Sequence, residues 1–244
     1  MLKKLITIVL AINLSLFPTI IQVDSSKTRS GAYHVDFSSM RYVAFGDSIT
    51  FGSDSSRPSY QMDEPYPKLV GDNLGFKQVD NQGICGATFC FNDKGSYCMT
   101  DNILTYTKEA DIISVMLGVN DFSIKSPLGD RNDQTNHTIY GCLNLIASYL
   151  TINYKDSFIF FMTPYKSAYV KDGDYLLMDI SNAIKQVALK NNIPVLDMFN
   201  YGNYEREMYL EYSDGLHPTQ NFVRRYTSPQ ITSFIRNNYK KYSA

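Results

Sequence analysis

The chain has 244 residues, with 23 Lys plus Arg against 24 Asp plus Glu, so its formal net charge is -1. This balance excludes a nucleic-acid binder driven by bulk positive charge, because affinity for phosphates requires clustered Lys and Arg. A hydrophobic fraction of 44% also excludes an acidic disordered chain. The length suits one folded domain of roughly 200–250 residues, large enough to bury a full core.

The first segment of the chain has the pattern of a targeting sequence. Lys3 and Lys4 precede an apolar run that begins at Leu5 and continues, less purely, to Ile21. A basic segment before an apolar one is typical of a secretory signal peptide. The run is short for a membrane span of ~20 apolar residues, but no clear A-x-A-like cleavage site ends it, so an uncleaved anchor is the alternative. We predict a signal peptide or N-terminal anchor at 1–25 and a single domain outside the cytoplasm at 26–244, in contact with a membrane only if the segment stays uncleaved.

Beyond this segment, apolar strands alternate with amphipathic helices. Strands are predicted at 42–46, 76–79, 111–117, 157–162 and 194–198, and helices at 66–74, 140–154, 175–190 and 221–239. The nearly continuous apolar strands indicate a parallel sheet that helices cover on both faces, which is an α/β fold. In such sheets the ligand crevice lies beyond the carboxyl ends of the strands.

The four cysteines are Cys85, Cys90, Cys98 and Cys142. An even number in an exported chain indicates disulfides, so we expect one or two that pin the loop-like stretch 85–98, for example Cys90 with Cys98. Buried free thiols are the alternative. A zinc site is not expected, because the chain has no C-x2-C pair and its three histidines are scattered.

Four short motifs carry residues suited to catalysis. Three of them follow predicted strands, and the last precedes the terminal helix: Gly46-Asp47-Ser48, Asn81-Gln82-Gly83, Gly118-Val119-Asn120-Asp121 and Asp214-Gly215-Leu216-His217-Pro218. Each motif alone is also compatible with an ordinary turn or helix cap.

The chemistry of these residue types is nevertheless complementary. A serine at a strand-to-helix turn lies where helix N-terminal amides favour negative charge. An aspartate three residues before a histidine can orient the imidazole, which can then take a proton from the serine. Gly83 allows close approach of the backbone, and Asn120 can donate a side-chain hydrogen bond to an oxyanion.

In this order the four motifs resemble those of the SGNH (GDSL-type) serine hydrolase family, and they extend from Gly46 to Pro218. Ile49 stands where the family commonly has Leu, and Val119 where Thr or another small residue is frequent. The resemblance implies a three-layer αβα fold with a flavodoxin-like parallel sheet of about five strands. It also implies an esterase that needs neither a metal nor a cofactor.

The resemblance further implies a role for each matched residue. Ser48 would be the nucleophile, His217 the general base and then the general acid, and Asp214 the residue that orients His217. The oxyanion hole would consist of the backbone amides of Ser48 and Gly83 and the side chain of Asn120.

The substrate is less well defined by the sequence. The expected export favours an ester on a small molecule, a glycan or a lipid, most simply an acetyl or short acyl ester, over an acyl-CoA. Tyr60, Tyr66, Tyr97 and Tyr165 lie close in sequence to the loops at strand ends and could stack on sugar rings, or else serve as packing residues. An acyltransferase with the same acyl-serine intermediate and a non-catalytic exported carbohydrate-binding module are the alternatives.

Overall fold

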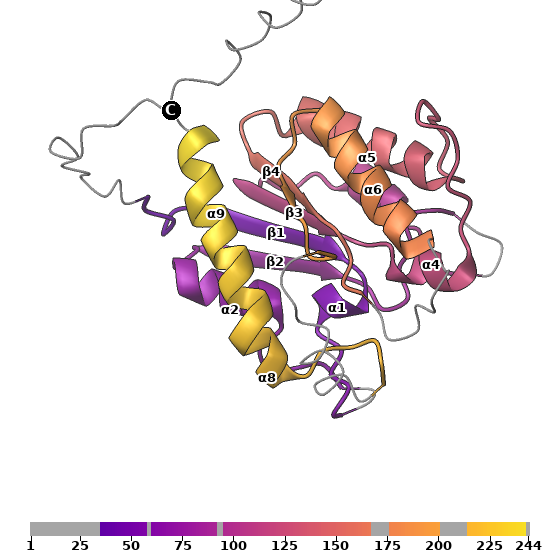
Figure 1. The fold of residues 1–244 in the computed structure, drawn as a ribbon. Coiled ribbons are helices and arrows are strands. Elements are labelled where there is room, and N and C mark those ends of the chain that lie inside the picture. Colours follow the sequence, from indigo (N-terminus) through magenta and orange to yellow (C-terminus); the bar gives the residue numbers. More distant parts are fainter. Residues whose placement is uncertain (1–34, 58–59, 92–94, 167–175, 201–213, 243–244) are drawn as a thin grey trace, which may run out of the picture. The chain divides into compact units, whose positions relative to one another are not determined.

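The computed structural model describes residues 35–57, 60–91, 95–166, 176–200 and 214–242. Within these residues, parallel strands form one sheet in the order β2-β1-β3-β4-β5 (Figure 1). The strands are β1 (Arg41–Gly46), β2 (Gln78–Gly83), β3 (Ile112–Met116), β4 (Phe158–Met162) and β5 (Val195–Leu196). The predicted α/β fold with a flavodoxin-like parallel sheet of about five strands is therefore confirmed.

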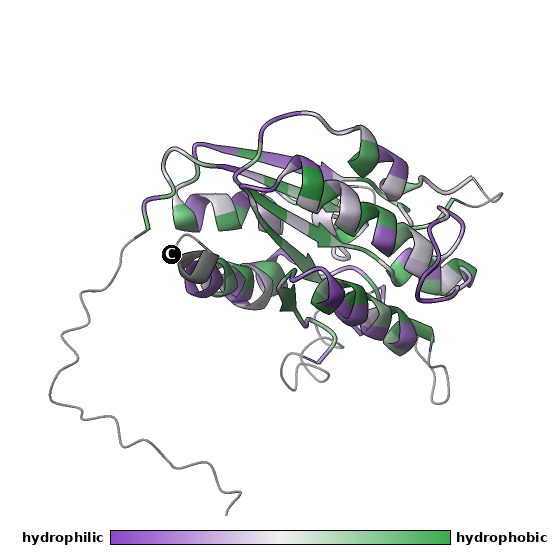
Figure 2. Cartoon of the chain, turned by 90° about the horizontal axis from the view of Figure 1, so that it is seen from above, coloured by the Kyte–Doolittle hydropathy of each residue, from purple (hydrophilic) through white to green (hydrophobic). Residues whose placement is uncertain are grey.

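Helices cover both faces of the sheet, which gives the three-layer arrangement. One face carries α2 (Tyr66–Leu74) and α9 (Ser228–Tyr242), and the other carries α3 (Met99–Thr105), α5 (Ile139–Asn153) and α6 (Leu176–Lys190). Shorter helices at the strand ends are α1 (Ser48–Phe51), α4 (Val119–Ile124), α8 (Gln220–Phe222) and the π-helical turn η1 (Val223–Thr227). In Figure 2 the central strands are mostly hydrophobic, whereas the helices carry hydrophobic and hydrophilic residues side by side.

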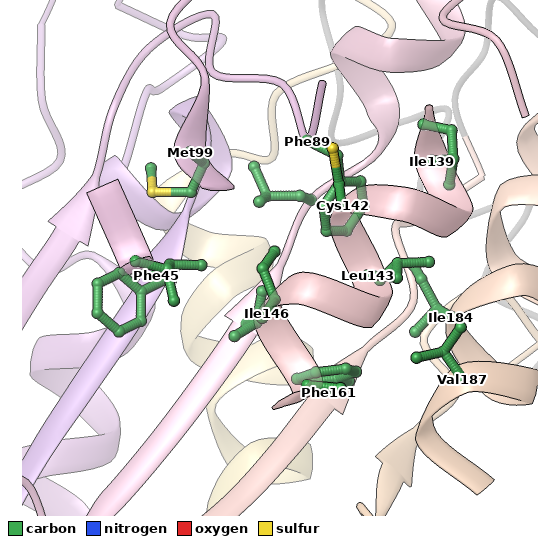
Figure 3. Close-up of a cluster of buried hydrophobic side chains, with 14 of the residues drawn as sticks. Phe45, Phe89, Met99, Ile139, Cys142, Leu143, Ile146, Phe161, Ile184 and Val187 are labelled. Carbon is green, nitrogen blue, oxygen red and sulfur yellow. The ribbon is translucent and has the colours of Figure 1, made fainter. Parts of the chain in front are cut away.

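Alternation along the strands divides the core into two halves. In β1, Val43 and Phe45 point into the half beneath α3, α5 and α6, while Tyr42 and Ala44 point into the half beneath α2 and α9. Figure 3 shows Phe45 and Phe161 of the sheet in the same cluster as side chains of α5 and α6. Every residue of β3 and β4 is buried, which explains why their sequences are continuous apolar runs.

The second strand differs from its prediction. We predict it at 76–79, but β2 extends from Gln78 to Gly83, so the Asn81-Gln82-Gly83 motif lies inside the strand rather than after it. β2 is an edge strand whose residues are at most partly buried, and its polar side chains carry no apolar periodicity. The predicted helix 221–239 is likewise three continuous elements, α8, η1 and α9.

The predicted N-terminal signal peptide or anchor, residues 1–25, lies outside the described residues. Among the residues that the structure describes, none of the helices combines the length and apolarity that crossing a bilayer requires.

Candidate active site

Three of the four motifs meet at one edge of the sheet. β1 lies between β2 and β3, and Gly46 at its carboxyl end is in register with Gly83 on one side and Met116 on the other. The segments that begin at Asp47, Ile84 and Leu117 therefore leave the sheet at adjacent points. This is the edge where parallel α/β sheets bind their ligands.

Ser48 is the first residue of the one-turn helix α1, which starts directly after β1. Asp47 is its N-cap, and the Asp47 carboxylate accepts a hydrogen bond from the Ile49 backbone N–H at 2.9 Å. Gly52, with a φ of 101°, ends the helix. The backbone N–H of Ser48 meets no acceptor among the described residues, so it can donate to a group beside the Ser48 hydroxyl.

A chain of hydrogen bonds joins Ser48 to the last motif, 169 residues further along the sequence. His217 Nε2 lies 2.8 Å from Ser48 Oγ, and His217 Nδ1 lies 2.7 Å from Asp214 Oδ2. The other carboxylate oxygen, Oδ1 of Asp214, accepts from the backbone N–H groups of Leu216 and His217, which closes the turn. Nδ1–H therefore donates to Asp214, and Nε2 is left to accept the Ser48 proton.

The charge on Asp214 is maintained by its hydrogen bonds. Burial alone would raise the pKa of this carboxyl, but the hydrogen bonds from the His217 ring and from the two backbone N–H groups lower it below its usual value. Asp214 is therefore ionised at neutral pH, which suits a residue that orients an imidazole and stabilises its protonated form.

Asn120 lies in the first turn of α4, directly after β3 and Gly118. One hydrogen of its amide Nδ2 is donated to the Ala87 carbonyl at 2.9 Å, and the second is available. The next residue, Asp121, is fully buried and accepts from the backbone N–H groups of Phe89 and Cys90 and from the Ser126 hydroxyl. The G-x-N-D motif thus attaches the segment 84–91 to α4, a role of Asp121 that we did not expect from the sequence.

Gly83 is placed differently from its expected role. Its backbone N–H donates to Asn81 Oδ1 at 2.9 Å, so this amide is not free for an oxyanion. A Cβ on Gly83 would lie 2.1 Å from the Phe51 nitrogen. The residue must be glycine because the backbone of α1 packs directly on it, and the expected contribution of Gly83 to an oxyanion hole is corrected accordingly.

Gly86, three residues further on, has the features expected of Gly83. It lies in an exposed turn with a φ of 76°, beside the Ala87 carbonyl that Asn120 binds. Its backbone N–H has no acceptor in the part of the chain that the structure describes. Gly86 is the second glycine of the run Asn81-Gln82-Gly83-Ile84-Cys85-Gly86, and this glycine is the feature of the sequence that could have indicated the donor. Without the backbone geometry, however, it cannot be distinguished from an ordinary turn glycine.

The expected disulfides are not present: Cys85, Cys90, Cys98 and Cys142 are all free thiols. Cys98 Sγ donates to the Phe89 carbonyl at 3.3 Å instead of bonding to Cys90. A hydrogen bond to the Cys142 thiol, together with burial, raises the pKa of the Cys90 thiol well above its usual value. The prediction of a Cys90–Cys98 disulfide is therefore wrong, because these side chains fill the core beneath the segment 84–91.

Tyr66 and Tyr165 are buried, whereas Tyr60 and Tyr97 are 69% and 45% exposed, so of these four tyrosines only Tyr60 and Tyr97 can meet a ligand.

Across the described ranges, no group of three or more His, Cys, Asp or Glu side chains is placed to hold a metal ion.

Comparisons with known proteins agree with this geometry. The model of the GDSL-like lipase/acylhydrolase family matches residues 44–224, which is well over half of the chain. The chain therefore belongs to the GDSL-like lipase/acylhydrolase family, as its four motifs indicate. A search of curated proteins gave no match.

Solved structures share the fold. A protein from Lactobacillus plantarum superposes with a TM-score of 0.69 at 24% identity, over 84% of this chain and 99% of that chain. A protein described as a possible lipase from Chitinophaga pinensis gives a TM-score of 0.64 at 21% identity, over 81% and 98% of the two chains. The aryl esterase of M. smegmatis gives 0.61 at 16% identity, over 82% and 99%.

The carboxyl of Asp47 gives a prediction for the pH dependence of stability. Burial raises its pKa from 3.8 to about 7, although the hydrogen bond from Ile49 N–H lowers it in part; the nearby Asp121 raises it further. The folded protein thus holds this proton more tightly than the unfolded chain does. The contribution of Asp47 to the free energy of unfolding should therefore fall as the pH rises from about 4 to about 7, by about 1.4 kcal/mol for each unit of pKa difference at most.

Asp47→Asn keeps an oxygen that can accept the helix-capping hydrogen bond, but it cannot titrate. The free energy of unfolding of this variant, measured in urea, should therefore decline less steeply than that of the wild type over the same pH range. Part of the decline in the free energy of unfolding should persist in the variant, because burial also raises the pKa of Asp121, to about 6. Asp63→Asn, at a side chain that is 81% exposed, is the control and should behave like the wild type. Identical pH profiles for Asp47→Asn and the wild type would show that Asp47 ionises normally.

Proposed function

We propose that the protein is a serine esterase that hydrolyses a carboxylic ester through an acyl-Ser48 intermediate. The observation that carries this proposal is the continuous hydrogen-bonded chain Asp214–His217–Ser48 at the carboxyl edge of the sheet. Membership of a family of lipases and acylhydrolases supports it. A serine alone is a weak nucleophile, and a base at 2.8 Å from its oxygen is what it needs.

Each step of the reaction uses a group in this chain. His217 Nε2 takes the Ser48 proton while Oγ attacks the ester carbonyl carbon, which gives a tetrahedral oxyanion. Collapse of this intermediate breaks the bond to the alcohol, which receives the proton from His217, and leaves the acyl group on Ser48. A water molecule then gives a proton to His217 and attacks the acyl carbon, and the carboxylic acid leaves as Ser48 recovers its proton.

We propose three donors for the oxyanion: the Ser48 N–H, the Asn120 side-chain amide and the Gly86 N–H. Gly86 replaces Gly83 in this role because its amide is free among the described residues and follows the same strand. Donors that are already in place before charge develops lower the barrier most. The positive φ of Gly86 explains why a residue without a side chain suits this turn.

For the substrate, we propose an acetyl or short acyl ester of a glycan or a small molecule, or a lipid ester. The exposed rings of Tyr60 and Tyr97 support a substrate with a face on which rings can stack. We further propose that the enzyme acts outside the cytoplasm. The basic and then apolar pattern of residues 3–21 supports this export.

Ser48→Ala should abolish turnover of p-nitrophenyl acetate while leaving the thermal unfolding temperature close to that of the wild type. A serine-reactive phosphonate should inactivate the wild type and label the peptide that contains Ser48. Ser53→Ala is the control, since the Ser53 hydroxyl forms a hydrogen bond only with the Cys85 thiol among the described residues, and it should remain active. Turnover by a folded Ser48→Ala variant would contradict the proposed nucleophile.

Asn120→Ala should lower kcat by about 10²–10³-fold with little change in KM, because the oxyanion exists only after attack. Steady-state kinetics with p-nitrophenyl acetate measures this split. Ser123→Ala, on the same helix, removes a hydroxyl that, among the described residues, bonds only to the Val119 carbonyl of α4, and it should be nearly silent. A loss of less than about 3-fold for Asn120→Ala would make Asn120 a structural residue of the turn rather than an oxyanion donor.

A further inference from the structure

The helix that carries Ser48 needs support from outside itself. α1 has only four residues, so the carbonyl groups at its C-terminal end have no partners further along a helix. Two side-chain amides supply the missing donors. Asn81 Nδ2 donates to the Thr50 carbonyl at 2.9 Å and lies 3.4 Å from the Phe51 carbonyl, which also accepts from Gln61 Nε2 at 2.7 Å.

Of these two side chains, Asn81 is the one whose position is held more rigidly. It belongs to β2 and pairs in register with Ala44 of β1, so its backbone is held by the sheet. Its Oδ1 accepts from the Gly83 N–H, which fixes the orientation of the amide group. Gln61 is exposed and lies in a loop. Asn81 therefore connects the rigid sheet to the far end of the helix that begins with Ser48.

The position of this helix determines two distances at once. Ser48 supplies Oγ, which lies 2.8 Å from His217 Nε2, and the backbone N–H that we propose as an oxyanion donor. A tilt of a one-turn helix would move both groups together. A displacement of ~1 Å from productive geometry can reduce the rate by about 10²-fold.

We propose that Asn81 is a positioning residue for the nucleophile, acting through its hydrogen bond to the C-terminal end of α1. This inference rests on the proposed function, because it takes Ser48 as the nucleophile. The Asn81 side chain bonds to α1 and to Gly83, and it acts on the reaction only by fixing where Ser48 lies. Its expected signature is a loss of kcat without a matching change in KM.

The test is Asn81→Asp, which has the same shape as the wild-type residue. The variant keeps the acceptor for the Gly83 N–H but places an oxygen, in place of a donor, against the Thr50 carbonyl. We expect kcat for p-nitrophenyl acetate to fall by about 10–100-fold and KM to change by less than about 3-fold. Labelling of Ser48 by the phosphonate should slow by a similar factor. Asn81→Ser, whose hydroxyl is too short to reach α1, provides a second variant if Asn81→Asp fails to fold.

The matched control is Gln82→Glu, an amide-to-acid change at the next residue of the same strand. Gln82 Nε2 donates to Asp80 Oδ1 at 2.6 Å, so this variant introduces repulsion into β2, and among the described residues its side chain makes no hydrogen bond to α1. It should lose thermal stability but keep its kcat. Circular dichroism and thermal unfolding of all variants separate loss of structure from loss of rate.

The possible outcomes distinguish failure of the positioning role of Asn81 from failure of the proposed function. Folded Asn81 variants with kcat within about 3-fold of the wild type would overturn the positioning role, as would an equal loss of kcat in Gln82→Glu. A wild-type protein that shows neither ester turnover nor labelling of Ser48 would overturn the proposed function itself, and with it the role of Asn81. Selective loss of kcat in the Asn81 variants supports both.

Discussion

Close packing of α1 against two glycines at the strand ends is the constraint on which the rest of the site depends. A Cβ on Gly46 would lie 1.9 Å from the Thr50 hydroxyl oxygen, and one on Gly83 would lie 2.1 Å from the Phe51 nitrogen. The Thr50 side chain lies against Gly46 and the backbone of α1 lies against Gly83, so the helix packs closely on the ends of β1 and β2. This contact places the first residue of α1, Ser48, at the centre of the carboxyl edge, where the histidine from the far end of the chain can reach it.

Buried polar contacts also hold α1 and the neighbouring segments in place. The Tyr66 hydroxyl, at the start of α2, lies 2.9 Å from Thr50 Oγ1 beneath α1. In α4, the buried carboxylate of Asp121 binds two backbone N–H groups of the segment 84–91. That segment carries Gly86 and also the Ala87 carbonyl that holds Asn120. Gly86 and Asn120, two of the three donors proposed for the oxyanion, are therefore linked through one network rather than carried on independent loops.

The sequence predicts the fold well where burial is complete. β3 and β4 are buried on both faces, so their apolar runs identify them, and α5 and α6 start and end within one residue of the predicted ranges. β2 is a polar edge strand, and its extent could not be found from periodicity. The short helices α1, α3 and α4 span too few turns for a pattern to emerge.

The same distinction applies to the site. The structure brings Ser48, Asp214 and His217 together, as their match in spacing and chemistry to a known set of motifs predicts. Gly83 and Gly86 could not be distinguished, since the direction of a backbone N–H depends on dihedral angles that glycine leaves open. The prediction of a disulfide was wrong for a related reason. An even number of thiols is compatible with disulfides, but only the packing of the folded chain shows that Cys98 forms a hydrogen bond with a backbone carbonyl.

The most direct test of the central claim is a crystal structure of the protein after reaction with a serine-reactive phosphonate, whose tetrahedral phosphorus stands in for the oxyanion intermediate. The phosphorus should be bonded to Ser48 Oγ. One phosphonate oxygen should lie about 2.7–3.1 Å from each of three nitrogens: the backbone nitrogens of Ser48 and Gly86 and Nδ2 of Asn120. Phosphorus bonded to another residue, or an oxygen that points away from these three donors, would contradict the account.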